Sequence, residues 1–180
     1  MALTKGSDVL ALRRLIQQQG PAREAAFVAS LAASVADLYD RVIATSWSPV
    51  TLQSALYEEA ARFLYPGDAD GLHRLGRQLA QASYSRIYRA FLLFPTVEYV
   101  VGRAARLWRA YYDEGEAEVQ RLGPRHLRFR LSYFPEFPRP LRTFLVSHME
   151  VLLEATGAKD VRISEEGLVE GVWSWSLQWS

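Results

Sequence analysis

The sequence contains no cysteine, which excludes disulfide bonds, thiolate metal sites and cysteine nucleophiles. It also has no apolar run of the roughly 20 residues that a membrane-spanning helix requires. The N-terminus shows no apolar run followed by a small-residue cleavage site, as a signal peptide would. We therefore expect a cytoplasmic protein with no membrane span.

The motifs of several enzyme classes are missing too. There is no Gly-x-Ser-x-Gly turn and no glycine-rich phosphate loop, and His73, His126 and His148 are too widely spaced for a metal motif. The net charge is only +1, and no helix-turn-helix pair is evident. We expect no enzymatic activity, no cofactor, no metal and no nucleic-acid partner. A buried carboxylate or histidine with a strongly perturbed pKa in a cleft would argue for an enzyme instead.

The length of 180 residues fits one domain, 1–180, with a helical part over 1–114 and a ββαββ part over 115–180. In the helical part, apolar residues recur with the period of a helix. Ser7 or Asp8 is placed to cap the first helix, which Gly20-Pro21 ends, and Ser48 is placed to cap a helix with Pro49 at its first position. The remaining predicted helices span 22–40, 72–92 and 96–113, the last two separated by Phe94-Pro95.

After Gly115 the apolar period changes to two, which is typical of strands. EAEVQRL and HLRFRLSYF form a predicted strand pair around Gly123-Pro124, followed by a helix that Thr156-Gly157 ends. DVRIS and the final GVWSWSLQWS are predicted strands, with Glu165 and Glu166 in the turn between them. The fold class is therefore α+β: N-terminal helices packed with a small antiparallel sheet (ββαββ) that carries one helix on its face.

Three tryptophans of the last predicted strand share one face. Trp173, Trp175 and Trp179 alternate with small polar residues. Burying all three removes on the order of 600 Å² from water, which is too much apolar surface to leave exposed. We expect this face to pack on the helix over 141–156, around Leu145, His148 and Leu152, with any excess covered by a second subunit.

Two groups of side chains in the middle of the chain are candidates for a site. Arginines dominate the charges between His73 and Arg109, where Glu98 is the sole acid. They suit a phosphate, a carboxylate or an acidic partner, but they equally suit solvated helix faces. The aromatic residues of the same region either line a ligand cavity or fill a core. His148, on the apolar side of its helix, is interpreted as a buried histidine with a hydrogen-bond partner in preference to a haem ligand.

Several stretches, KGSDVLALRRLI, SWSPV, HRLGRQLA, IYRAFLLF and ARLWRAYYDEG, resemble in this order an uncharacterised family expanded in myxobacteria and their relatives. That family in turn resembles, more remotely, vinyl-reductase-type small-molecule-binding domains, haem nitric-oxide-binding domains and TRAPP transport-particle subunits. The resemblance implies helices wrapped against a small antiparallel sheet, a common dimeric state and, in several members, an apolar ligand pocket between the two.

The chain departs from these relatives at two places. Vinyl-reductase-type domains often carry cysteines near their last strands, whereas EEGLVEGVWSWSLQWS has none, which excludes a thiol role there. Haem nitric-oxide-binding domains hold the haem propionates with a Tyr-x-Ser-x-Arg clamp. The stretches Tyr84-Ser85-Arg86 and Ser132-Tyr133 both lack that spacing, so a haem role loses most of its support.

Our first hypothesis is a non-enzymatic sensory or binding domain that takes an apolar or amphipathic small molecule between helices and sheet and passes occupancy to a protein partner. Tyrosine and tryptophan side chains would form the walls, and arginines would hold an anionic head group. The predicted ligand-binding residues are Tyr84, Tyr88, Arg86, Arg89, Trp108, Arg109 and Tyr112.

The alternative hypothesis is a homodimeric interaction module with a solid core and no ligand. Under both hypotheses we expect a homodimer. The two differ in one observable, because only the first needs an internal cavity on the order of 300 Å³ or more.

Overall fold

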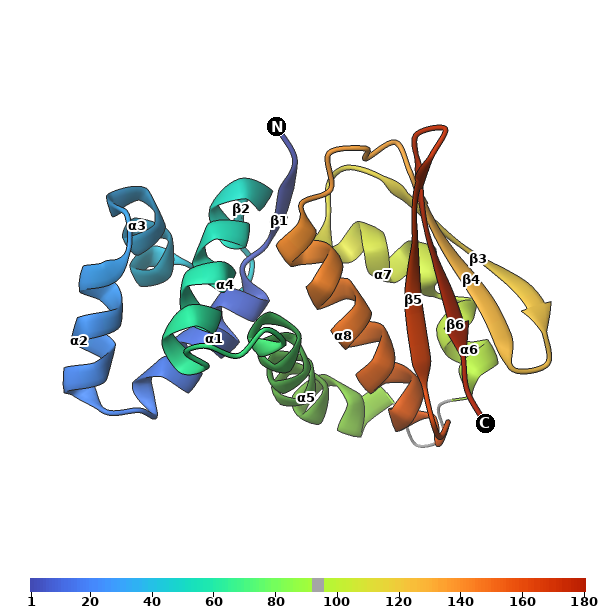
Figure 1. Ribbon diagram of the computed structural model, residues 1–180, viewed down its shortest axis with the longest axis horizontal. Helices are drawn as coiled ribbons and strands as arrows, with labels where there is room; N and C mark the ends of the chain where they lie inside the picture. The colour runs from blue at the N-terminus through green and yellow to red at the C-terminus, as the bar shows by residue number, and fades with distance from the viewer. Residues whose placement is uncertain (92–95) are drawn as a thin grey trace.

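The computed structural model describes the backbone of residues 1–91 and 96–180 and the side chains of residues 1–83 and 96–180. In Figure 1 the N-terminal helices lie on one side and the sheet on the other. In chain order the elements are β1 (Leu3–Lys5), α1 (Ser7–Gln17), α2 (Pro21–Ser30), α3 (Ala33–Arg41), β2 (Trp47–Pro49), α4 (Val50–Leu64), α5 (Gly71–Phe91), α6 (Val97–Val101), α7 (Ala104–Tyr111), β3 (Glu116–Gly123), β4 (His126–Ser132), α8 (Arg139–Ala155), β5 (Arg162–Val169) and β6 (Val172–Gln178).

The single helix predicted over 22–40 is wrong, because the structure divides this segment into α2 and α3. Leu31 and Ala32 are extended between the two helices, with ψ near 147° and 146°. The break lets the helices fold back on each other, as Figure 1 shows. The Phe27 and Tyr39 rings meet edge to face at 5.5 Å. Burial of these rings therefore outweighs the local preference for one continuous helix.

The start of α4 also differs from the sequence prediction. Trp47–Pro49 is a short strand, β2, that pairs antiparallel with β1. Ser48 therefore does not cap α4: its hydroxyl oxygen accepts a hydrogen bond from the Gln53 amide at 2.8 Å, and Pro49 occupies the position before the first helical residue. The pairing holds the N-terminus of the chain against α4.

The helix predicted over 96–113 is two helices, α6 and α7, separated by Gly102 and Arg103. Gly102 ends α6, in keeping with the low helix propensity of glycine. The break shifts the rotational phase of α7 relative to one continuous helix. The predicted helix over 72–92 corresponds to α5, while the predicted break at Phe94-Pro95 lies outside the described residues.

The C-terminal part confirms the predicted α+β fold class. Its strands form a four-stranded antiparallel sheet in the order β3-β4-β6-β5, with α8 inserted in the chain between β4 and β5. The register places Leu127, Phe129 and Leu131 opposite Leu177, Trp175 and Trp173. Apolar side chains of neighbouring strands therefore gather on one face of the sheet.

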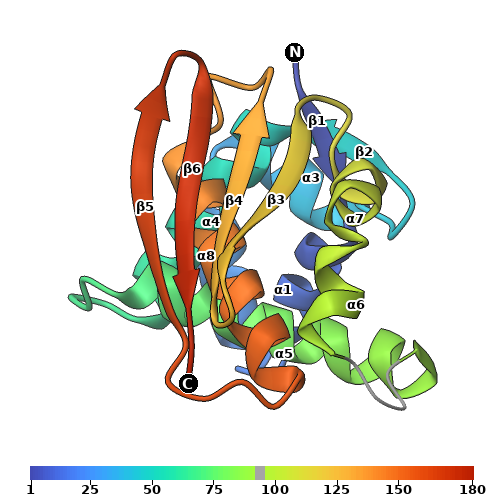
Figure 2. The same cartoon turned by 90° about the vertical axis from the view of Figure 1, so that its right-hand side faces the viewer.

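Helix α8 covers this apolar face, while Figure 2 shows the opposite face toward the viewer with no helix in front of it. Trp175 is completely buried, in edge-to-face contact with Phe129 at 5.8 Å. Trp173 is half-buried: the Arg142 guanidinium lies over its ring at 4.0 Å, and its indole N–H donates to the Pro135 carbonyl. The tryptophan face is thus largely covered within one chain.

The predicted hairpin turn at Glu165 and Glu166 is wrong. Both residues lie within β5, and the turn falls at Glu170 and Gly171, which have φ angles of 50° and 79°. An irregularity in the pairing between Glu165 and Gly167 sends the two carboxylates to different partners. Glu165 pairs with Arg142 of α8, and Glu166 pairs with Arg128 of β4.

We predict that Trp175→Ala lowers the free energy of unfolding by about 3–5 kcal/mol, because the residue is fully buried in the core. Val169→Ala is the control on the neighbouring strand: Val169 is 67% exposed, so its loss costs less than about 0.5 kcal/mol. Urea unfolding followed by circular dichroism measures both. A cost below ~1 kcal/mol for Trp175→Ala would contradict this packing.

Candidate functional site

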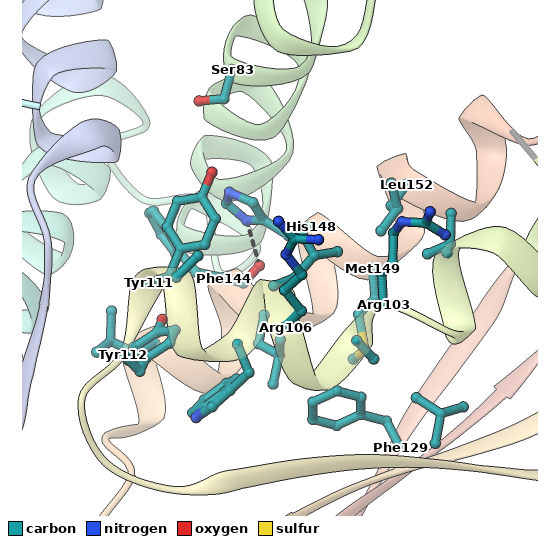
Figure 3. A pocket seen from close by; sticks show the side chains of 18 of the residues that line it. Ser83, Arg103, Arg106, Tyr111, Tyr112, Phe129, Phe144, His148, Met149 and Leu152 are labelled. Atoms are coloured by element: carbon teal, nitrogen blue, oxygen red, sulfur yellow. Dashed lines mark hydrogen bonds between the residues drawn. The ribbon is translucent and has the colours of Figure 1, made fainter. Parts of the chain in front are cut away.

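A cavity of about 430 Å³ lies between the helical part and the sheet. Its walls are mainly apolar. Helix α8 contributes Phe144, Leu145, Met149 and Leu152, and the sheet contributes Leu127, Phe129 and Leu177. Helix α7 closes another side with Leu107 and Trp108. Figure 3 shows side chains of α7 and α8 facing each other across this space.

A carboxylate and an imidazole from opposite ends of the chain meet in the wall of this cavity. His148 Nε2 of α8 lies 3.3 Å from the Asp8 carboxylate of α1. The other ring nitrogen, Nδ1, is 2.8 Å from the Phe144 carbonyl oxygen, which only accepts, so Nδ1 donates. With a carboxylate at one nitrogen and a carbonyl at the other, the doubly protonated imidazolium is the favoured form.

Hydroxyl groups surround this pair. The Ser83 hydroxyl donates to Asp8 at 3.3 Å, and the Tyr57 hydroxyl donates to Gln53 at 2.8 Å. Tyr111 and Tyr112 also line this end of the cavity. Burial raises the pKa of Tyr57, Tyr111 and Tyr112, and the nearby Asp8 charge raises each pKa further. These tyrosines are therefore neutral hydroxyls at physiological pH.

The ion pair reverses the effect of burial on the pKa of both Asp8 and His148. Burial alone would raise the pKa of Asp8, but the charge of His148 and hydrogen bonds from His148 and Ser83 lower it overall. Burial alone would lower the pKa of His148, but the Asp8 charge and the hydrogen bonds to Asp8 and Phe144 raise it overall. Both shifts therefore favour the charged forms of the pair, whose charges balance each other.

This arrangement does not activate Ser83 as a nucleophile. In a catalytic triad the serine hydroxyl bonds to the imidazole, which removes its proton. Here the Ser83 hydroxyl donates to the carboxylate, and the imidazole is already protonated. The pKa shifts of Asp8 and His148 therefore reflect an ion pair between α1 and α8, those of the tyrosines reflect mainly burial, and we assign no general base.

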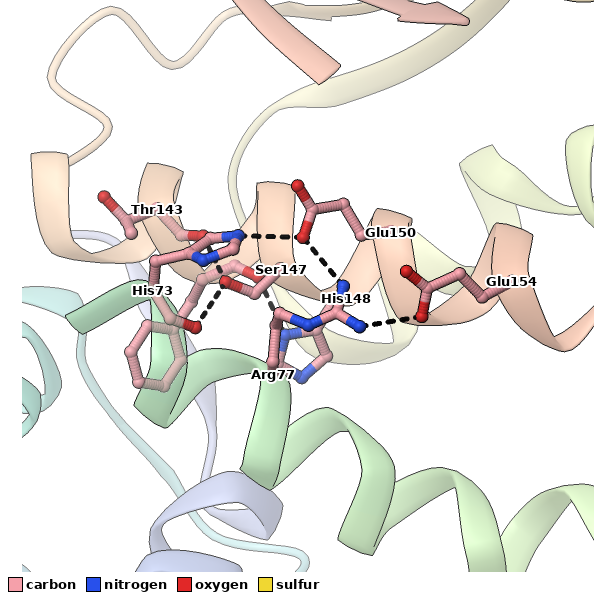
Figure 4. Close-up of polar contacts among 8 residues, drawn as sticks. His73, Arg77, Thr143, Ser147, His148, Glu150 and Glu154 are labelled. Atoms are coloured by element: carbon pink, nitrogen blue, oxygen red, sulfur yellow. Dashed lines mark hydrogen bonds and ion pairs between the residues drawn. The ribbon is translucent and has the colours of Figure 1, made fainter. Parts of the chain in front are cut away.

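A second polar network joins α5 to α8 beside the cavity (Figure 4). Arg77 bridges Glu150 and Glu154 at 2.9 and 2.8 Å, and His73 lies 2.8 Å from Glu150. Ser147 donates to a backbone carbonyl of α5. A Cβ on Gly76 would lie only 2.7 Å from the Ser147 hydroxyl oxygen, so only glycine permits the two helices to approach this closely. These contacts hold α8 in place behind the site.

The structure brings two of the seven predicted ligand-binding residues to the cavity. Trp108 and Tyr112 stack at 4.2 Å and line it together. Arg109 is exposed on the same helix and is not among the described lining residues. The side chains of the other four, Tyr84, Arg86, Tyr88 and Arg89, lie outside the described part of the structure. Their assignment as ligand-binding residues stays a prediction.

Four charged residues of the described cavity lining were not among the predicted site residues: Lys5, Asp8, Arg103 and Arg106. Asp8 was predicted to cap α1, yet no side chain caps that helix, and the carboxylate contacts His148 instead. Arg103 and Arg106 line the cavity, and they belonged to the predicted arginine group without being chosen from it. Their spacing of three residues was visible in the sequence. Which side of α7 faces the cavity was not visible, because it depends on the helix break at Gly102.

A family model covers almost the whole chain. Residues 10–180 match the model described as protein of unknown function (DUF2378). The chain belongs to this family. No curated protein matches the chain.

Solved structures of H-NOX domains have a similar fold. A mutant H-NOX protein from K. algicida in its unliganded Fe(II) form is 11% identical, with a TM-score of 0.68 over 98% of this chain and 96% of that chain. An oxygen-binding H-NOX domain related to soluble guanylate cyclases is 10% identical, with a TM-score of 0.65 over 97% of this chain and 92% of that chain. The likeness confirms the predicted remote resemblance to haem nitric-oxide-binding domains at the level of the fold.

The residues of this cavity do not fit a histidine-ligated haem. Among the described lining residues His148 is the one histidine, and its Nδ1 and Nε2 contact the Phe144 carbonyl and the Asp8 carboxylate. His73 pairs with Glu150, and His126 contacts Ser176, both away from the cavity. Iron binding through a tyrosine requires the phenolate. The raised pKa values of Tyr57, Tyr111 and Tyr112 disfavour that form.

No cluster of three or more histidine, aspartate or glutamate side chains among the described residues is placed to hold a metal ion. Within the same residues, no helix is both long enough and apolar enough to cross a membrane.

We predict that the Asp8–His148 pair makes stability depend on pH. The folded-state pKa of His148 is raised, so protonated His148 stabilises the folded state. This contribution to the free energy of unfolding is fully present below the unfolded-state pKa of about 6.5, and it is lost as pH rises through the folded-state pKa. The folded-state pKa of Asp8 is lowered, so the Asp8 carboxylate contributes to the free energy of unfolding above a pH of about 4. This contribution is lost on further acidification. Asp8→Asn should therefore cost about 3–5 kcal/mol near pH 5–6, and less once pH rises above the folded-state pKa of His148.

The control for this measurement is Asp37→Asn, which removes an exposed ion pair to Arg41. It should change the free energy of unfolding by less than about 0.5 kcal/mol at every pH. Chemical denaturation of the wild type and both variants across this pH range gives the comparison. A cost for Asp8→Asn that is independent of pH would contradict a charged pair.

Proposed function

We propose that this chain is a non-enzymatic sensory or binding domain that takes an apolar or amphipathic small molecule into the cavity between α7, α8 and the sheet. The observation that carries the proposal is the cavity itself, at about 430 Å³. Small-molecule sites typically span about 300–1,000 Å³, with apolar walls and a few polar groups that fix orientation. The alternative hypothesis, a homodimeric interaction module with a solid core, does not require such a cavity.

The polar groups of the cavity support binding in preference to catalysis. Asp8 and His148 neutralise each other, and the tyrosine and serine hydroxyls nearby suit hydrogen bonds to an uncharged polar atom of a ligand. The apolar walls would provide most of the binding free energy, at about 25 cal/mol per Å² of apolar surface removed from water.

The position of the cavity supports a sensory role. Its lining comes both from the N-terminal elements β1, α1 and α4 and from α7, α8 and the sheet. A ligand there contacts both parts of the chain. It shifts their relative arrangement if it binds one arrangement more tightly than another. We propose that a protein partner detects this change, and we retain the homodimer as a prediction.

The proposal can be tested with two alanines that are neighbours in α7. Ala104 is half-buried and lines the cavity, whereas Ala105 is exposed and does not. Ala104→Trp should fill the space and weaken binding of the fluorescent probe anilinonaphthalene sulfonate at least tenfold, while Ala105→Trp should leave it unchanged. Fluorescence titration measures both dissociation constants, and circular dichroism confirms that both variants fold.

Equal weakening by the two substitutions would place the probe on the surface of α7. An absence of probe binding to the folded wild-type protein would favour the interaction module. Either result would overturn the binding-domain proposal.

A further inference from the structure

The described lining of the cavity carries an excess of positive charge. Its cationic side chains are Lys5, Arg103, Arg106 and the protonated His148, while Asp8 is the one carboxylate in that lining. The Asp8 carboxylate pairs with His148 and accepts a hydrogen bond from Ser83. The Lys5 ammonium of β1 donates to the Thr45 carbonyl at 3.4 Å and lies over the Trp47 ring, whereas the two arginines lie one turn apart at the start of α7.

No acid of the described structure neutralises these arginines. The nearest acid in sequence, Glu98, pairs with Arg121 at 2.8 Å. The Arg103 guanidinium lies 3.5 Å from the centre of the Tyr99 ring and donates to the Tyr99 carbonyl, which leaves its charge uncompensated. The sequence from 71 to 97 contains no aspartate or glutamate, so the residues outside the description bring no carboxylate either.

The two arginines lie on α7, while the Asp8–His148 pair joins α1 to α8. Arg103 directly precedes α7 and Arg106 follows one turn later, so both face the same side of the helix. Leu107, Met149 and Leu152 line the space. Figure 3 shows Arg103 and Arg106 on α7, across from Met149 and Leu152 of α8.

We propose that the ligand is an amphipathic carboxylate whose head group binds Arg103 and Arg106 and whose apolar tail packs against the apolar walls between α7, α8 and the sheet. This inference rests on the proposed function. Guanidinium groups match the two oxygens of a carboxylate, which supplies the missing negative charge. Because both arginines are exposed to water, they select the head group while the tail supplies most of the affinity.

The test compares decanoate with decanol, which share a tail and differ in charge. Calorimetric titration of the wild-type protein should give binding of both, with decanoate about tenfold tighter. The double variant Arg103→Gln, Arg106→Gln should lose this preference and retain decanol binding. The control Arg125→Gln, Arg139→Gln removes the same net charge from two exposed arginines outside the cavity lining and should retain the preference.

The outcomes distinguish binding of a small molecule in the cavity from recognition of its head group by Arg103 and Arg106. If neither decanoate nor decanol binds, the proposed function fails. If both bind equally to the wild type, or if the control variant loses the preference as fully as the test variant, the binding proposal stands and the assignment of Arg103 and Arg106 is overturned. Loss of decanol binding in a folded test variant would also overturn the selective role of the arginines.

Discussion

Packing on both sides of α8 is the constraint on which the rest of this structure depends. One side of the helix covers the apolar face of the sheet, and the other contacts α5, where Gly76 lets Ser147 approach closely. Between these two contacts, His148 reaches Asp8 of the first helix. The cavity exists because α8 and α7 both lie against the sheet without filling the space between them. Any ligand there is in direct contact with the element that joins the two parts of the chain.

The C-terminal part was predictable because its signals are local. Alternating apolar residues mark β4 and β6, and a positive φ of 88° at Gly157 follows the end of α8. The helix break at Leu31 was missed because tertiary packing decides it, whereas the break at Gly102 has only the weak local signal of glycine's low helix propensity. The Asp8–His148 pair has no local signal at all: an aspartate in a first helical turn ordinarily suggests a cap, and no spacing rule connects it to a histidine at the other end of the chain.

The fold alone does not determine the chemistry of this site. H-NOX domains share the arrangement of helices and sheet at 10–12% identity. In this chain the one histidine among the described lining residues contacts a carboxylate and a carbonyl, and two arginines without acidic partners in the described structure also line the cavity. These apolar walls, the neutralised pair and the arginines are the features on which we base the proposal of an amphipathic anion.

Native mass spectrometry of the purified protein tests the central claim most directly, by comparing gentle with denaturing conditions. The account predicts that a small molecule carrying an acidic group is retained under gentle conditions and released on unfolding, with a mass different from that of haem. A folded protein that carries no bound molecule and does not bind added decanoate under the same conditions would contradict the account. Retention of haem would contradict it as well.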